Sequence, residues 1–199
     1  MSGMYFTHSL VGAASSKLVI DRVEKKFTER EKRVLWVIGI TASVLPDFDL
    51  IYSALNHMVN HRDFITHGIF IYLLMSIFLY FLSFIRDKEE FGRKFFKTLA
   101  LVFLLGILAH FLMDFIVGGI VFFAPFSYKI VGFEMISQRG SGNWLLKYLD
   151  SIYMVLELFN LTIFLLLLKD KKYSFGKMIA LSYVLMAIFA FLFINVVYF

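Results

Sequence analysis

The chain has 199 residues, of which 60% are hydrophobic and 18% are charged, and its mean hydropathy is +0.77. A soluble domain of this length cannot bury so much apolar surface, so the composition excludes an ordinary soluble fold. It predicts an all-α membrane bundle that forms one domain over residues 1–199. The net charge is +5, but the basic residues lie in short clusters between apolar runs, so we expect no nucleic-acid partner.

Apolar runs of about 20 residues, the length that crosses a bilayer, follow one another along the chain. Residues 5–20 are short and rich in small residues, so we expect a half-helix or an interfacial helix there. The helix that begins near residue 34 should end near Val44, because Pro46 follows. Residues 118–146 fit a re-entrant or surface segment. The predicted spans after the first two segments are 64–85, 98–117, 148–168 and 178–199. Five or six transmembrane helices result.

Basic residues predict the orientation of this bundle. Sixteen of the 20 Lys and Arg lie in three short loops, residues 17–33, 86–97 and 169–177. The positive-inside rule places these loops in the cytoplasm and predicts a multi-pass protein of the plasma (inner) membrane. The segments 47–62 and 118–147 then lie on the opposite side.

Histidine and aspartate side chains should gather on that opposite side. His8 opens the first segment, and His110 and Asp114 lie near the outer end of the predicted helix 98–117. The i, i+4 spacing puts His110 and Asp114 on one helix face, and the alternative for this pair is a hydrogen bond that joins two helices. The full candidate set of metal ligands is His8, Asp47, Asp49, His61, His67, His110 and Asp114.

Imidazoles and carboxylates in a chain without cysteine suit Zn²⁺, with manganese and iron as alternatives. Seven candidate ligands are too many for one tetrahedral ion and suit two or three metals, as in two-metal phosphoester cleavage. Arg62 is the single Lys or Arg between Arg33 and Arg86, and we expect it to bind a phosphate, with a lipid-headgroup anchor as the alternative. Asp47 or Asp49 would orient the attacking water or act as base.

Four further residues have expected roles that rest on their position alone. Thr66 is counted with Arg62 as substrate-binding, and His57 is read as a surface residue. Asp150 lies near the outer end of its predicted helix and could join the site. Glu157 lies deeper, where we expect it to bind a neighbouring helix.

The motifs are Thr7-His8, Leu45-Pro46-Asp47-x-Asp49, His61-Arg62-x-x-x-Thr66-His67 and His110-x-x-x-Asp114. Over about residues 1–126 they resemble the YdjM-like family of membrane-bound metal-dependent hydrolases, also described as LexA-regulated and associated with the inner membrane. That family is similar in motif order to zinc-dependent phospholipase C and P1 nuclease, which are helical enzymes with a trinuclear zinc site. The resemblance implies metal ligation by His8, an Asp of the Pro46 turn, His61 or His67, His110 and Asp114.

The chain departs from these patterns in two places. Asp63 stands where the family commonly has glycine after the His-Arg pair. No histidine follows His110, so the His-x-x-x-Glu helix of the phospholipases is absent. A third metal would then need Asp150 or Glu157 as a substitute ligand.

We therefore expect a membrane-embedded, metal-dependent hydrolase of phosphoester bonds in a lipid or lipid-linked substrate. Two alternatives remain open: a transition-metal or proton-coupled transporter, and a non-catalytic protein stabilised by metal. Membrane lipid is the expected environment and a candidate substrate. The sequence indicates neither the oligomeric state nor whether the enzyme would be a phosphatase or a phosphodiesterase.

Overall fold

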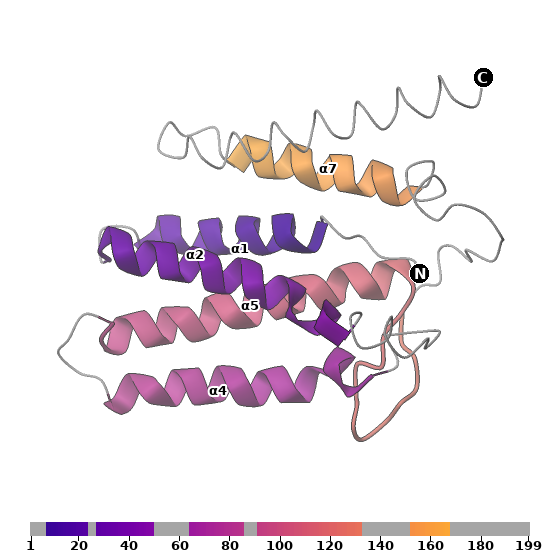
Figure 1. Ribbon diagram of the computed structural model, residues 1–199, viewed down its shortest axis with the longest axis horizontal. Coiled ribbons are helices and arrows are strands. Elements are labelled where there is room, and N and C mark those ends of the chain that lie inside the picture. The colour runs from indigo at the N-terminus through magenta and orange to yellow at the C-terminus, as the bar shows by residue number, and fades with distance from the viewer. Residues whose placement is uncertain (1–6, 24–26, 50–63, 86–90, 133–151, 168–199) are drawn as a thin grey trace.

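The computed structural model describes residues 7–23, 27–49, 64–85, 91–132 and 152–167, and these ranges are helical apart from connecting turns and one isolated bridge (Figure 1). The prediction of an all-α fold is confirmed. The elements in chain order are α1 (Thr7–Val23), α2 (Glu29–Val44), η2 (Leu45–Phe48), η4 (Ile65–His67), α4 (Ile69–Ile85), α5 (Arg93–Val117) and α7 (Ile152–Leu167), where η denotes a 3-10 helix.

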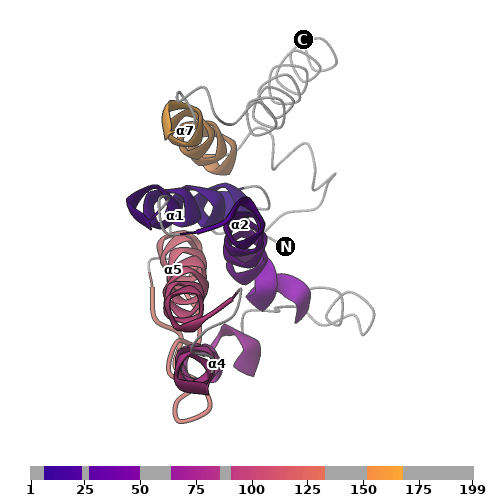
Figure 2. The same cartoon turned by 90° about the vertical axis from the view of Figure 1, so that its left-hand side faces the viewer.

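Helix α5 packs against α1, α2 and α4, and α1 packs against α2, α5 and α7 (Figures 1 and 2). The expectation of a half-helix or interfacial helix at residues 5–20 is wrong, because α1 has 17 residues and lies inside the bundle. Leu10, Ala13 and Ile20 are buried there. Composition could not reveal this, since small residues suit close helix packing as well as they suit a short helix.

Glycines allow α1, α2 and α5 to approach closely. A Cβ atom at Gly12 would overlap the Ser43 hydroxyl, and one at Gly39 would overlap the Ser16 hydroxyl. A Cβ at Gly106 of α5 would lie 2.8 Å from the Gly39 carbonyl oxygen. Small residues of this kind are typical of membrane helix interfaces, where packing rather than the hydrophobic effect drives association. The three helices therefore form the closely packed centre of the bundle.

The ends of the helices follow local rules. Helix α2 begins with a capping box, in which Thr28 accepts from the backbone of Glu31 and the Glu31 carboxylate accepts from the Thr28 N–H. It ends at Val44, as Pro46 predicted, and η2 continues the chain.

Three predicted helix starts differ from the structure, and the first is that of α2, which begins at Glu29 rather than near residue 34. Helix α4 begins at Ile69 rather than at residue 64, because η4 forms first and the Ile69 N–H donates to the Phe122 carbonyl. Helix α5 begins at Arg93 rather than at residue 98. Hydropathy places the start of this helix where the charged residues stop. The helix itself extends through those charged residues, because backbone hydrogen bonding does not require apolar side chains.

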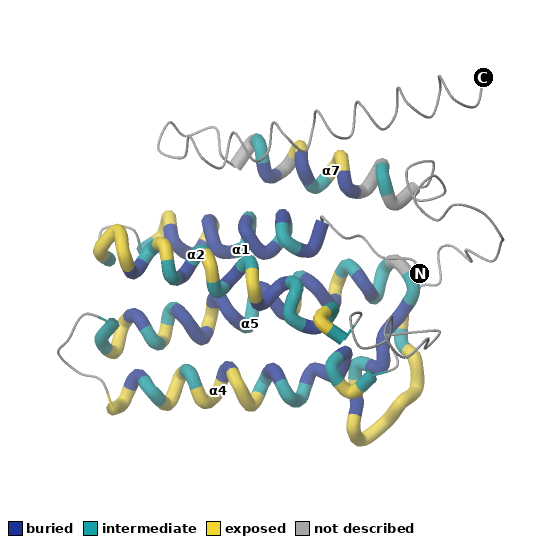
Figure 3. Tube along the Cα trace, viewed as in Figure 1, coloured by how far each residue is buried: buried dark blue, intermediate teal, exposed yellow. Residues whose placement is uncertain are grey.

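Among the described residues, α5 is the one helix that is long and apolar enough to cross a membrane, over Arg93–Ile116. Helix α4 is shorter, with 17 residues, and its outer face is exposed and apolar, with Leu74, Phe78 and Phe81 at the surface (Figure 3). Five or six spans remain a prediction, and residues 178–199 lie outside the described part of the chain.

Residues 118–132 return from the end of α5 toward the start of α4, at the end of the bundle that carries η2 and η4 (Figure 1). Ile120 and Val131 form an antiparallel bridge, and Ile120, Val121 and Ala124 are buried. Phe126 and Tyr128 are exposed at 78% and 57%. The described part of the predicted re-entrant or surface segment is thus a surface loop that covers one end of the bundle; residues 133–146 lie outside the described ranges.

Candidate metal centre

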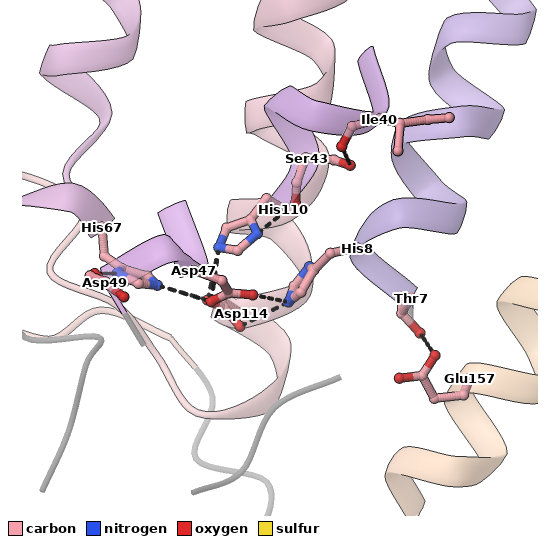
Figure 4. A network of polar contacts seen from close by, with 10 residues as sticks. All are labelled: Thr7, His8, Ile40, Ser43, Asp47, Asp49, His67, His110, Asp114 and Glu157. Atoms are coloured by element: carbon pink, nitrogen blue, oxygen red, sulfur yellow. Dashed lines mark hydrogen bonds and ion pairs between the residues drawn. The ribbon is translucent and has the colours of Figure 1, made fainter. Parts of the chain in front are cut away.

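Five ionisable side chains from four separate segments meet at this end of the bundle (Figure 4). Helix α1 contributes His8 from its second position, and η4 contributes His67 from its last. The turn after α2 contributes Asp47, and helix α5 contributes His110 and Asp114 one turn apart. Residues separated by up to about a hundred positions in the sequence are therefore side by side.

The Asp114 carboxylate lies between the three imidazoles. Its Oδ2 is 3.3 Å from His110 Nε2 and 3.5 Å from His67 Nε2. Its Oδ1 is 3.6 Å from His8 Nε2. One oxygen thus faces His8, and the other faces the pair His67 and His110.

Asp47 repeats this arrangement. Its Oδ2 is 3.7 Å from His8 Nε2, and its Oδ1 is 3.6 Å from His67 Nε2 and 3.9 Å from His110 Nε2. Two carboxylates that each face two sets of nitrogens have the form expected of bridging ligands.

The ring of His110 is oriented by the backbone of α2. Its Nδ1 lies 2.8 Å from the carbonyl oxygen of Ser43, which can only accept, so Nδ1 carries a proton. The buried Nε2 makes no hydrogen bond to any residue in the described ranges. A neutral ring would therefore turn its Nε2 lone pair toward Asp114, and two acceptors 3.3 Å apart need a proton or a cation between them.

A metal cation can meet this requirement without protonating every ring. The ring centroids of His8 and His110 are 4.1 Å apart, and those of His67 and His110 are 5.6 Å apart. Three imidazolium ions at such distances in a buried site would repel one another. Bound divalent cations would offset the charge of the carboxylates and leave the imidazoles neutral.

His67 is oriented by a carboxylate. Its Nδ1 lies 3.0 Å from Asp49 Oδ2, and the Thr66 hydroxyl donates to the same oxygen. The Tyr72 hydroxyl in turn donates to the Thr66 carbonyl at 2.8 Å. Carboxylates commonly hold metal-ligating histidines in this way, fixing which ring nitrogen faces the metal. The structure therefore places Asp49 behind His67 and leaves Asp47 and Asp114 at the centre of the cluster.

Burial separates Asp47 from the rest. The side chains of His8, His67, His110 and Asp114 are at most 1% exposed, whereas that of Asp47 is 21% exposed. An incoming molecule would meet Asp47 first.

The donor set fits a metal ion. His8, Asp47, His110 and Asp114 each offer one ligand atom, and these atoms lie within 4.8 Å of one another. Zn²⁺ binds nitrogen and oxygen at 2.0–2.2 Å in a tetrahedron, which puts neighbouring ligand atoms about 3.3 Å apart. The four distances between a histidine Nε2 and its nearest carboxylate oxygen, 3.3 to 3.9 Å, lie near that value, and His8 and His110 face different oxygens of each carboxylate. The identity of the metal is not determined by these donors.

Several predicted site residues lie outside the described ranges, namely His57, His61, Arg62 and Asp150. Glu157 is described, and the expectation that it binds a neighbouring helix is confirmed, because its Oε2 accepts a hydrogen bond from Thr7. The Ser43 carbonyl was not anticipated as a partner of His110. Every residue carries a carbonyl, so the sequence holds no signal for this contact.

The chain matches the model of the family described as "YdjM inner membrane protein" over residues 1–197. No curated protein and no solved structure matches the chain. The family description supports a location in the inner membrane, in agreement with the apolar composition. The match covers nearly the whole chain, which therefore belongs to the YdjM inner membrane protein family.

Proposed function

We propose that this protein is a membrane-embedded, metal-dependent hydrolase of phosphoester bonds in a lipid or lipid-linked substrate. The observation that carries the proposal is the buried cluster of three histidines and two aspartates, which four separate segments bring to one end of the bundle. Buried ionisable groups in a membrane protein are costly and mark functional sites by default. The proposal places this end on the non-cytoplasmic side.

The ligands would be His8, His67 and His110 together with Asp47 and Asp114. Because each carboxylate faces His8 with one oxygen and the other two histidines with its second oxygen, the set suits two ions with shared carboxylates. When bound, Zn²⁺ or Mn²⁺ supplies Lewis acidity that polarises a phosphoryl oxygen and lowers the pKa of water. A third ion would require ligands beyond the described residues.

The chain's own residues would supply orientation and proton transfer. Asp47 is the exposed member of the cluster and is placed to accept a proton from an entering water. Asp49 and Thr66 hold His67, so we assign Asp49 to orientation of the site rather than to the base role. Arg62, three positions before η4 in the sequence, remains the proposed phosphate ligand.

A lipid substrate is supported by the surroundings of the cluster. The exposed apolar face of α4 continues toward the loop 118–132, where the Phe70 and Phe126 rings are in contact with centroids 4.7 Å apart. A lipid tail can lie along such a face while its headgroup reaches the polar end of the bundle. This arrangement favours a substrate that stays in the membrane.

A transport function has less support. Residues 9–16 of α1, 34–46 through α2, and 98–109 of α5 contain no ionisable side chain. Eight helical residues span about 12 Å and twelve span about 18 Å, so an ion would travel about 12 to 18 Å beside these helices without a charged or imidazole ligand. The cluster thus lies at one end of the bundle and does not continue as a path through these three helices.

Metal content per chain, measured on detergent-purified protein, is the test. We expect two or more Zn or Mn ions per chain in the wild type and their loss in the double variant His110→Ala/Asp114→Ala. Thr98→Ala is the control, because Thr98 lies on the same helix away from the cluster and is half-buried, with its hydroxyl donating to the Lys94 carbonyl. Retained metal is expected in this control.

The result decides between the candidate functions. A wild-type protein that contains no transition metal and cannot be loaded with one would overturn the proposal. Bound metal with turnover of phospholipid or phosphoester substrates supports it. Metal uptake into proteoliposomes that His110→Ala abolishes would favour the transporter, and metal whose removal unfolds the protein, with no turnover, would favour a structural site.

A further inference from the structure

The position of His8 poses a structural problem. His8 is the second residue of α1, and Thr7 is the first. Segments near the end of a helix open more readily than helix centres. A metal ligand at such a position needs an anchor, because metal affinity depends on a ligand that is already in place.

Helix α7 supplies a carboxylate at this position. The Thr7 hydroxyl donates to Glu157 Oε2 at 2.8 Å, and the two residues are 0% and 4% exposed (Figure 4). They are 150 positions apart in the sequence, so the contact joins the first described helix to the last. A hydrogen bond to a carboxylate is stronger than one between neutral groups, and burial strengthens it further.

The charge of Glu157 suits its location as well. The N-terminal end of a helix carries a partial positive charge, and a carboxylate there stabilises the first turn. Helix α1 has no acidic residue in its own first turn, and the partner helix brings one. Leu161 and Phe164 of α7 pack against Leu10 of α1, which holds the two helices in register.

We propose that Glu157 is a positioning residue of the metal centre: from the neighbouring helix it accepts the hydrogen bond of the Thr7 hydroxyl, fixes this part of α1 and thereby holds His8 toward Asp47 and Asp114. The proposal rests on the metal site of the proposed function and adds to it a residue outside the ligand set. Glu157 touches neither metal nor substrate in this role.

The first variants remove each partner of the contact. Glu157→Ala and Thr7→Val, which keeps the shape of threonine without its hydroxyl, should each lower the affinity for Zn²⁺ by about 10- to 100-fold, the usual effect of losing an outer-shell partner. The double variant should lose no more Zn²⁺ affinity than the more affected single variant, because all three variants remove the same hydrogen bond. Thr7→Ser retains a hydroxyl and should keep affinity close to that of the wild type.

A packing variant separates positioning from helix docking. Leu161 is buried between the same two helices and makes no polar contribution, so Leu161→Ala should lower the thermal stability of the bundle and leave Zn²⁺ affinity within about threefold of the wild type. The Zn²⁺ affinities of the wild type and of each variant are measured by competition with a chelator on the full-length, detergent-purified protein.

Hydrogen exchange of metal-free protein gives a second readout. Glu157→Ala should speed exchange of the amides in the first turn of α1 more than Leu161→Ala does at matched overall stability. Unchanged Zn²⁺ affinity in Glu157→Ala, or an equal loss in Leu161→Ala, would overturn the positioning role. Should the wild type bind no metal, the proposed function fails, and unchanged exchange in Glu157→Ala would separately overturn the role of Glu157 in fixing the start of α1.

Discussion

The two ends of the bundle contain charged and polar side chains in different arrangements. At the end where α1 finishes and α2 begins, ion pairs form between close neighbours in the sequence: Lys17 with Asp21, and Lys32 with Glu29. At the other end, His67 and His110 approach Asp47 from positions 20 and 63 residues away. Pairs of the first kind stabilise single helices, and they need no function to explain them.

The histidine contacts at the second end show a consistent direction. His110 and His67 each use Nδ1 for a carbonyl or carboxylate behind the ring and direct Nε2 to the cluster. If these polar side chains had gathered by chance, we would expect each ring nitrogen to have its own hydrogen-bond partner and the Nε2 atoms to point in different directions. The comparison indicates that this end is built around something between the rings, and the following predictions test that difference.

The largest expected effect is that of pH on metal binding. Imidazole binds a metal only when deprotonated, and the ordinary pKa of histidine is about 6.5. Lowering the pH from 8 to 5.5 adds proton competition at up to three histidines, so Zn²⁺ affinity should fall by about a hundredfold or more. Isothermal titration in buffers of different ionisation enthalpy should also show proton release on binding.

Thermal unfolding provides the control for the pH effect. Added Zn²⁺ should raise the unfolding temperature at pH 8 more than at pH 5.5, because a ligand stabilises in proportion to the logarithm of its concentration over Kd. Equal stabilisation by Zn²⁺ at pH 8 and at pH 5.5 would mean that the histidines are not ligands.

The next effect is that of Asp49→Asn, which tests orientation of His67. Asparagine keeps the shape of the aspartate side chain but is neutral. The oxygen that faces His67 and accepts from Thr66 then no longer belongs to a carboxylate. We expect about 10- to 100-fold weaker Zn²⁺ binding with an unchanged number of ions per chain. A lost ion instead of weakened binding would show that Asp49 is itself a ligand, as the sequence suggested.

The smallest effect is expected at the other end, in Glu31→Ala. This carboxylate completes the capping box with Thr28 and accepts from the Phe91 N–H at 3.3 Å. Its loss should cost about 1 kcal/mol of unfolding free energy and leave metal binding unchanged. Glu29→Ala is the control, because Glu29 pairs with Lys32 at an 82% exposed position and should change stability by less than about 0.5 kcal/mol.

An altered metal affinity in Glu31→Ala would contradict the separation of the two ends. It would mean that the start of α2 and the turn at Asp47 move together. Chelator competition on both glutamate variants measures this directly.

Parts of this structure follow from local sequence. Apolar runs predict helices, Pro46 ends α2 at Val44, and the i, i+4 spacing puts His110 and Asp114 on one face of α5. These features depend on residues within one or two turns of each other. The same holds for the candidate ligands, since imidazole and carboxylate are rare in apolar segments and therefore stand out.

Other parts depend on contacts between distant segments. The central place of α1 follows from fitting Gly12 and Gly39 against serines of the partner helix, and the later start of α4 follows from a hydrogen bond to Phe122. The direction of each ring is set by Ser43 and Asp49, which only the packed bundle brings near.

The sequence by itself thus determined the helical class, the family membership and the residue types of the cluster, because hydropathy and side-chain chemistry are properties of single residues. Only the tertiary structure decided which carboxylates face the histidines and which stands behind one, and that Glu157 reaches the start of α1. Those assignments are distances between atoms on different helices, and no periodicity within one segment encodes them.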